Sequence, residues 1–149
     1  MSISASINIC LSERSRANLS LADLFQNFVN EGWKYVNSNG EVTILPLGDN
    51  DGFDWTSTIL HRDSLIDILK KKQEQKEIIG IELMQVDCEV GCELLIFNTN
   101  QMIFSLSIAR KKIKVKDDID ITDFSWYLER ILPVFKNLQV EQIKCEQLL

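Results

Sequence analysis

The residues in this sequence that are best suited to catalysis include a single histidine. Serine and cysteine nucleophiles generally need a histidine as base, and His61 is the only histidine in the chain. Its neighbours Arg62 and Asp63 precede a predicted helix, a position typical of an exposed residue. No serine lies in a G-x-S-x-G turn, and no glycine-rich phosphate-binding motif occurs. We therefore expect no enzymatic activity; the alternative is a small enzyme that uses His61 with nearby carboxylates.

Four cysteines form the second group with reactive side chains. Cys88 and Cys92 have a C-x3-C spacing, but Cys10 and Cys145 have no companion nearby. A structural zinc site needs four ligands, usually two such pairs. The segment Met1–Ser6 has neither the basic nor the apolar region of a secretory signal, so we expect reduced thiols in the cytoplasm. The sequence predicts no metal ion and no cofactor.

A turn-rich segment at residues 48–55 carries acidic and aromatic side chains together. Its members are Asp49, Asp51, Phe53, Asp54 and Trp55. A calcium loop with Gly52 in sixth place would begin at Leu47 and end at Thr58, and neither residue fits the ligand that an EF-hand needs there. Exposed rings among carboxylates favour protein binding, because the rings supply desolvated area and the acids steer a basic partner. Alternatively, the two rings pack in the core.

A second acidic group lies further along the chain. It contains Glu82, Asp87, Glu89 and Glu93. These carboxylates are typical of a solvated strand face and turn, and they also suit a metal ion or a basic protein. We predict that Asp87, Glu89 and Glu93 form a second partner-binding patch.

The composition limits the remaining possibilities. The chain has 149 residues, of which 45% are hydrophobic, and a net charge of −6. This length and composition predict one domain with its own core, residues 1–149. The negative charge argues against direct nucleic-acid binding. The basic run 110–116 alternates with Ile113 and Val115, as on an edge strand protected by lysines. No apolar run reaches the ~20 residues of a membrane span.

Hydrophobic periodicity predicts the elements of the first half. Residues 3–11 alternate as in a half-buried strand, and Ser20 is expected to cap a helix that ends near Gly32. Asn39-Gly40 predicts a type I′ hairpin turn between strands at about 33–37 and 41–46. Asp63 or Ser64 is expected to cap the next helix.

Strands dominate the second half. Apolar runs at 78–86, 94–97 and 102–109 predict three strands. Thr122 is expected to cap a terminal helix that Pro133 interrupts, and residues 140–145 form a possible last strand. The fold class that follows is α+β: a single domain with a mainly antiparallel sheet of about five to six strands and three helices.

The whole chain resembles the immunity proteins of bacterial contact-dependent growth inhibition, a polymorphic toxin system. The resemblance is prompted by Asp54-Trp55-Thr56-Ser57, by the strand-rich middle, and by Thr122-Asp123-Phe124-Ser125-Trp126-Tyr127-Leu128. It implies a cytoplasmic protein that binds and neutralises a cognate toxin domain, often a basic nuclease, in a one-to-one complex. A structural or adaptor subunit of a larger assembly is the alternative.

Overall fold

The computed structural model describes residues 3–97, 101–115 and 119–149. Within these residues, eight strands form one sheet in the order β10-β1-β7-β6-β5-β3-β4, and β2 also pairs with β5. Every strand pair is antiparallel. The strands of this sheet are β1 (Ser4–Leu11), β2 (Trp33–Lys34), β3 (Val42–Ile44), β4 (Thr56–Thr58), β5 (Ile79–Gln85), β6 (Gly91–Ile96), β7 (Gln101–Ile108) and β10 (Val140–Leu148).

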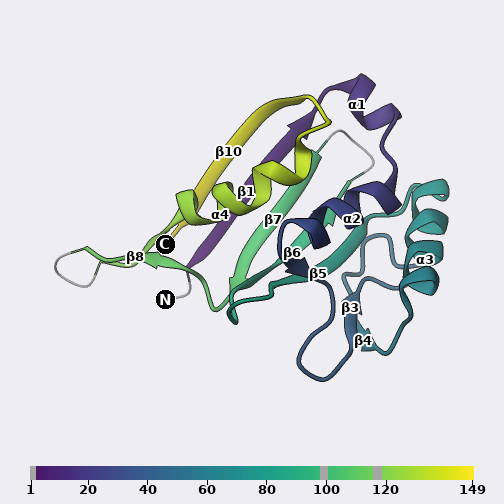
Figure 1. The fold of residues 1–149 in the computed structure, drawn as a ribbon, viewed down its shortest axis with the longest axis horizontal. Helices are drawn as coiled ribbons and strands as arrows, with labels where there is room; N and C mark the ends of the chain where they lie inside the picture. Colours follow the sequence, from purple (N-terminus) through teal and green to yellow (C-terminus); the bar gives the residue numbers. More distant parts are fainter. Residues whose placement is uncertain (1–2, 98–100, 116–118) are drawn as a thin grey trace.

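In the described part of the chain, four α-helices accompany this sheet, and those that pack on it cover one of its faces. In chain order they are α1 (Glu13–Ala17), α2 (Leu21–Asn30), α3 (Arg62–Glu74) and α4 (Phe124–Ile131), followed by the 3-10 helix Leu132–Phe135. Figure 1 shows α2 and α4 in front of the sheet, with α3 at the side that carries β3 and β4. A separate two-stranded hairpin consists of β8 (Lys112–Ile113) and β9 (Ile121–Thr122). It lies at the opposite edge of the sheet from β3 and β4, beside β10.

Alternating side chains of the strands build the core against these helices. In β1 the buried row is Ala5, Ile7, Ile9 and Leu11. The ring of Phe28 in α2 lies 6.1 Å from the ring of Phe104 in β7 and 6.4 Å from that of Phe135. A buried side chain of this kind stabilises the fold by about 1.5–3 kcal/mol, so this layer holds helices and sheet together.

The opposite face of the sheet carries no helix among the described residues. We call it the open face, defined by the alternate strand side chains that point away from the helices. One row across it runs through directly opposed residues, namely Ser6 of β1, Ser105 of β7, Glu93 of β6 and Glu82 of β5. These side chains are half-buried. The row is entirely polar, so this face meets solvent or a partner.

The α+β class and the antiparallel sheet are confirmed, whereas the predicted numbers of strands and helices are too low. The described residues form ten strands and four α-helices. Helix α1 has only five residues and no buried side chain, so it lacks a hydrophobic period; the Ser12 hydroxyl caps it by accepting from Ser15 N. All three residues of β4 are exposed, which removes the alternation that identifies a strand.

The Asn39-Gly40 turn is confirmed in position, but its predicted type and pairing are wrong. Gly40 has a φ of 76°, whereas Asn39 does not have the positive φ that type I′ requires. The side chain of Asn37 accepts hydrogen bonds from the backbone N–H groups of Asn39 and Glu41 and so shapes the turn. Strand β2 then pairs with β5, and a single bridge joins the two arms of the predicted hairpin.

Two predicted helix caps are also wrong. Helix α3 begins after His61, which makes no side-chain capping bond, so Ser64 lies inside the helix. Asp123, rather than Thr122, caps α4 by accepting a hydrogen bond from Trp126 N at 3.1 Å. The interruption at Pro133 is confirmed, because α4 ends at Ile131 and the chain continues as a 3-10 helix.

Candidate protein-binding surface

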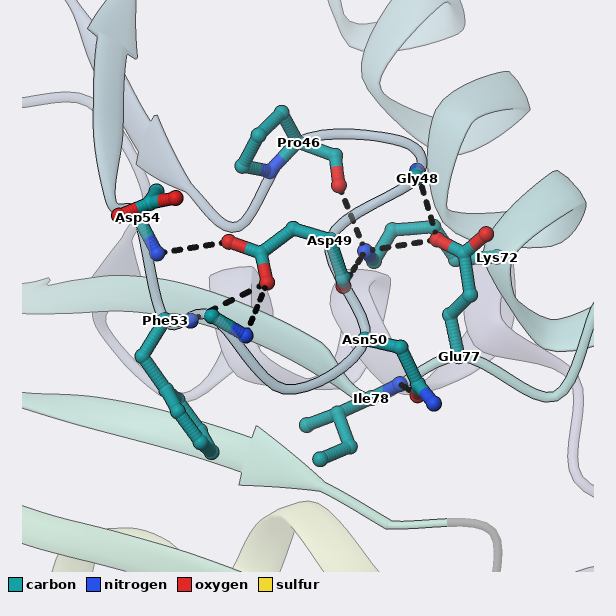
Figure 2. Close-up of polar contacts among 10 residues, drawn as sticks. Pro46, Gly48, Asp49, Asn50, Phe53, Asp54, Lys72, Glu77 and Ile78 are labelled. Carbon is teal, nitrogen blue, oxygen red and sulfur yellow. Dashed lines mark hydrogen bonds and ion pairs between the residues drawn. The ribbon is translucent and has the colours of Figure 1, made fainter.

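The acidic segment between β3 and β4 is folded around the carboxylate of Asp49. One of its oxygens accepts hydrogen bonds from Gly52 N at 2.9 Å and Phe53 N at 3.1 Å, and the other accepts from Asp54 N at 2.6 Å (Figure 2). A short side chain bonded to its own following backbone is the usual way in which aspartate shapes a turn. We call residues 48–55 the acidic loop. Asp49 therefore holds the loop together from within.

A buried lysine attaches this loop to α3. The ammonium group of Lys72 donates to Pro46 O at 2.7 Å and to Asp49 O at 2.8 Å, and it pairs with Glu77 at 3.1 Å. Its side chain is fully buried. Glu77 also accepts from Gly48 N at 2.8 Å. Since all three donors of the ammonium group have acceptors, the loop is fixed by a complete polar network (Figure 2).

Both carboxylates in this network have lowered pKa values. The hydrogen bond from Asp54 N is the main cause of the lowered pKa of Asp49, and the bonds from Gly52 and Phe53 and the charge of Lys72 add to it. Burial opposes this, but it does not prevail. Burial alone would raise the pKa of Glu77, yet the bonds from Gly48 and Lys72 outweigh it and lower that pKa. The network is therefore held in its charged form at neutral pH.

The loop displays Phe53 to solvent on a strained backbone. Phe53 has a φ of 53°, and its side chain is 43% exposed. A left-handed conformation is rare for an aromatic residue and costs about 1–2 kcal/mol, which the three bonds of Asp49 offset. Asp51 and Asp54 on either side of it are exposed. The prediction of an exposed ring between carboxylates thus agrees with the position of Phe53.

Trp55 lies differently, because it is partly buried against β5. A β carbon on Gly80 would lie 2.9 Å from Cη2 of Trp55 and 2.7 Å from Cδ1 of Leu45. Only glycine at residue 80 lets both side chains approach the strand this closely. Trp55 therefore packs as a support of the loop, in agreement with the alternative that it is a packing residue.

The second predicted patch is divided between a turn and the open face. Asp87 and Glu89 are exposed in the turn that joins β5 to β6. Glu93 lies on the open face, where it stands directly opposite Glu82. Ser107 donates a hydrogen bond to Glu93 at 3.0 Å. Burial, and then the charge of Glu93, raise the pKa of Glu82. Like charges directly opposed on neighbouring strands destabilise a sheet, so a cationic group near this pair would stabilise it.

The two patches lie near opposite ends of β5. Asn50 in the acidic loop accepts a hydrogen bond from Ile78 N just before the strand begins, whereas Asp87 follows its end. The seven residues of β5 that lie between these points span roughly 20 Å. The open face connects them. Gly80, which lies under Trp55, and Glu82 are two residues apart and therefore face the same side of β5. A partner of ordinary interface size spans this distance.

The other residues considered for chemistry lie apart from this surface. Cys92 points into the core, fully buried, while Cys88 is exposed in the turn. The side chain of His61 is exposed and makes no capping hydrogen bond to α3. Within residues 3–97, 101–115 and 119–149, no three histidine, cysteine, aspartate or glutamate side chains are grouped to hold a metal ion.

A cavity of about 740 Å³ lies away from the predicted patches. It is lined by the α1 region, the end of α3 and one end each of β5 and β6, and its charged residues include Glu13, Arg16, Lys76 and Glu77. Its mixed charges do not define one ligand class. None of the eight predicted partner-binding residues lines it.

No protein-family model matches this chain, and no curated protein or solved structure shows significant similarity to it. None of the described helices combines the length and the apolar composition of a membrane-spanning segment. The function must therefore be argued from the surface itself.

Sequence reasoning missed the residues that make the acidic loop rigid. Lys72 lies in a run of cations near the C-terminus of α3, where charge alone favours an exposed side chain. Its position three residues after the buried Leu69 and seven after Leu65 places it on the apolar side of α3. That spacing is the one signal in the sequence that marks Lys72 as different from the exposed Lys70 and Lys71.

Proposed function

We propose that this chain is a cytoplasmic immunity protein that binds a cognate toxin domain and neutralises it by one-to-one protein–protein inhibition. The toxin class that best suits its charge is a basic nuclease. The acidic loop would make the central contact. The toxin would cover the exposed ring of Phe53, with Asp51 and Asp54 beside it. Asp87, Glu89 and Glu93 would form the second contact, across the open face.

The observation that carries this proposal is the strained, exposed position of Phe53 within a fixed polar network. A large ring exposed on a fixed backbone loses little conformational entropy on binding, which favours affinity. Backbone strain of this kind is found mostly where function requires it. The bonds of Asp49 to the residues around Phe53 therefore support a preorganised binding site.

Electrostatics supports a basic partner. The chain carries a net charge of −6, and the exposed Asp51 and Asp54 have no ion pair in the described residues. Glu82 and Glu93 repel each other unless a cation lies near them. Complementary charge speeds association with a basic protein, and rapid capture is what an inhibitor of a toxin needs.

The test measures binding to the toxin domain encoded beside this chain and protection of cells that express both. Phe53→Ala should weaken binding about 30-fold or more, as expected for a central aromatic contact. Asp51→Lys with Asp54→Lys should slow association and reduce its dependence on salt. Retention of full affinity and protection by both variants would contradict the proposed site.

A matched control separates local contact from overall charge. Glu13→Lys with Glu129→Lys changes two exposed acids outside the acidic loop and the open face, and it shifts the net charge by the same amount. This control should bind within a few-fold of the unmodified chain. An equal loss in the control would show that only net charge matters.

A further inference from the structure

Strand β10 forms a long edge of the sheet with one free side. It runs for nine residues and pairs with β1. In the described part of the chain, the backbone of residues 141–146 makes hydrogen bonds to β1 alone. Natural sheets protect such an edge with proline, a short strand, a covering segment or charged side chains; β10 carries charges of both signs, at Glu141, Lys144 and Glu146, which can pair with those of a second copy. β10 has no proline, and its side chains from Glu141 to Cys145 are all exposed.

The helix-facing row of side chains is incomplete at this edge. Ile143 stands directly opposite Ile9 on the face that the helices cover. Ile9 is fully buried, whereas Ile143 remains 41% exposed. One more strand beside β10 would extend the sheet and bring Ile143 into the core layer.

We propose that two copies of this chain associate through their β10 strands, antiparallel, about a two-fold axis that passes beside Cys145. The sheets then continue from one copy into the other, with the helices of both on the same side. A symmetric strand pair of this kind is an isologous interface, in which the same surface serves both copies. This inference does not depend on the proposed function.

Charge selects the register. With the axis at Cys145, Lys144 of each copy stands opposite Glu146 of the other, which gives two ion pairs. Lys144 and Glu146 already pair within one chain at 3.1 Å on the open face. The four charges would therefore alternate in sign across the axis.

The neighbouring registers with the same side-chain alternation are less favourable. An axis at Lys144 would oppose two lysines, and an axis at Glu146 would oppose two glutamates. An axis at Ile143 would place Lys144 opposite Gln142 and form no ion pair. Directly opposed like charges destabilise a strand pair, so the register at Cys145 is preferred.

The hairpin of β8 and β9 lies at one end of the interface in this register. Its base is tied to β10, because the side-chain oxygen of Gln147 accepts from Thr122 N at 2.8 Å and its amide donates to Asp120 O at 2.7 Å. Figure 1 shows this hairpin beside the end of β10. In this register Gln147 stands opposite Ile143 of the second copy, so the base of the hairpin lies at the same end of the interface as that isoleucine.

Analytical ultracentrifugation of the full chain across the micromolar range tests the association. We expect a dimer with twice the mass of one chain. Lys144→Glu should weaken the dimer at least tenfold, because the substituted residue of each copy would stand opposite Glu146 of the other. The double variant Lys144→Glu with Glu146→Lys should restore the dimer. A chain that stays monomeric, or a dimer that neither substitution changes, would overturn the proposal.

Oxidative crosslinking tests the register separately. Diamide accepts the two electrons and two protons that two thiols release when a disulfide forms. A crosslinked dimer should form rapidly in the Cys88→Ser variant, which keeps Cys145, and not in Cys145→Ser. Both cysteines are exposed in the single chain, so exposure alone predicts no such preference. Crosslinking through Cys88 instead would overturn the register.

Discussion

The ammonium group of Lys72 lies 2.8 Å from the carbonyl oxygen of Asp49, although one residue belongs to α3 and the other to the acidic loop. This contact places a charged group beneath the loop and away from solvent. The loop that displays Phe53 is thus held from two sides: by Asp49 within it and by Lys72 below it.

Lys72→Met should lower the free energy of unfolding by about 3 kcal/mol. The substitution keeps the apolar stem but leaves the carboxylate of Glu77 and two backbone carbonyls without their buried donor. Urea denaturation measures this loss. Lys71→Met, at the exposed neighbouring residue of the same helix, is the control and should change stability by less than about 0.5 kcal/mol.

Acid should loosen the acidic loop. Because the folded protein lowers the pKa values of Asp49 and Glu77, their charged forms stabilise the fold above the unfolded pKa values, near 4. That contribution is lost as the pH falls through the lower pKa values of the folded state. Urea midpoints measured from neutral pH down to pH 3 should fall steeply, and Asp49→Asn should flatten this decline. An unchanged slope would show that Asp49 does not stabilise the loop through its charge.

Glu82→Gln should make the fold more stable at neutral pH by roughly 0.5 kcal/mol, because it removes one of two directly opposed carboxylates. Since the pKa of Glu82 is raised in the folded state, the carboxylate is penalised above that pKa and relieved below it. The difference between variant and parent should therefore vanish as the pH falls through the raised pKa. Thermal unfolding at several pH values measures it, with Glu89→Gln in the exposed turn as a control that should show little change.

The thiols should react in the order of their exposure. Burial, with smaller contributions from Glu93 and Glu82, strongly raises the pKa of Cys92, which is fully enclosed in the core. Thiolate is the reactive form, so iodoacetamide should modify Cys88 rapidly and Cys92 only after denaturation. Peptide mass spectrometry distinguishes the two sites. Equal rates at both cysteines would contradict the packing of β6.

How far the sequence predicts this structure depends on whether a signal is local. The alternation from Ile3 to Leu11 predicts β1, and Ser20 predicts the start of α2, because both signals depend on neighbouring residues. The pairing of β2 with β5 joins Trp33 to Gln85, and no local pattern encodes so distant a partner.

The same distinction applies to the candidate surface. The turn residues around Gly52 predict a loop, and its acids and rings predict a protein-binding surface. The depth of Trp55 against Gly80 and the contact of Lys72 with the loop arise only when α3 and β5 are assembled. Sequence therefore predicts which side chains gather in the loop, while tertiary packing decides which of them stay exposed.

The position of β1 between two strands that come late in the chain has a consequence for folding during synthesis. Its neighbours are β7 and β10, so Ile7 stands opposite Phe104 and Cys145, each about a hundred residues or more later in the chain. At ~5–20 residues per second, a ribosome needs roughly 5–20 s to produce the first of these partners. Until then the apolar row of β1 has no strand beside it. We expect slow, late folding, and a nascent chain that depends on chaperones to keep β1 from aggregating.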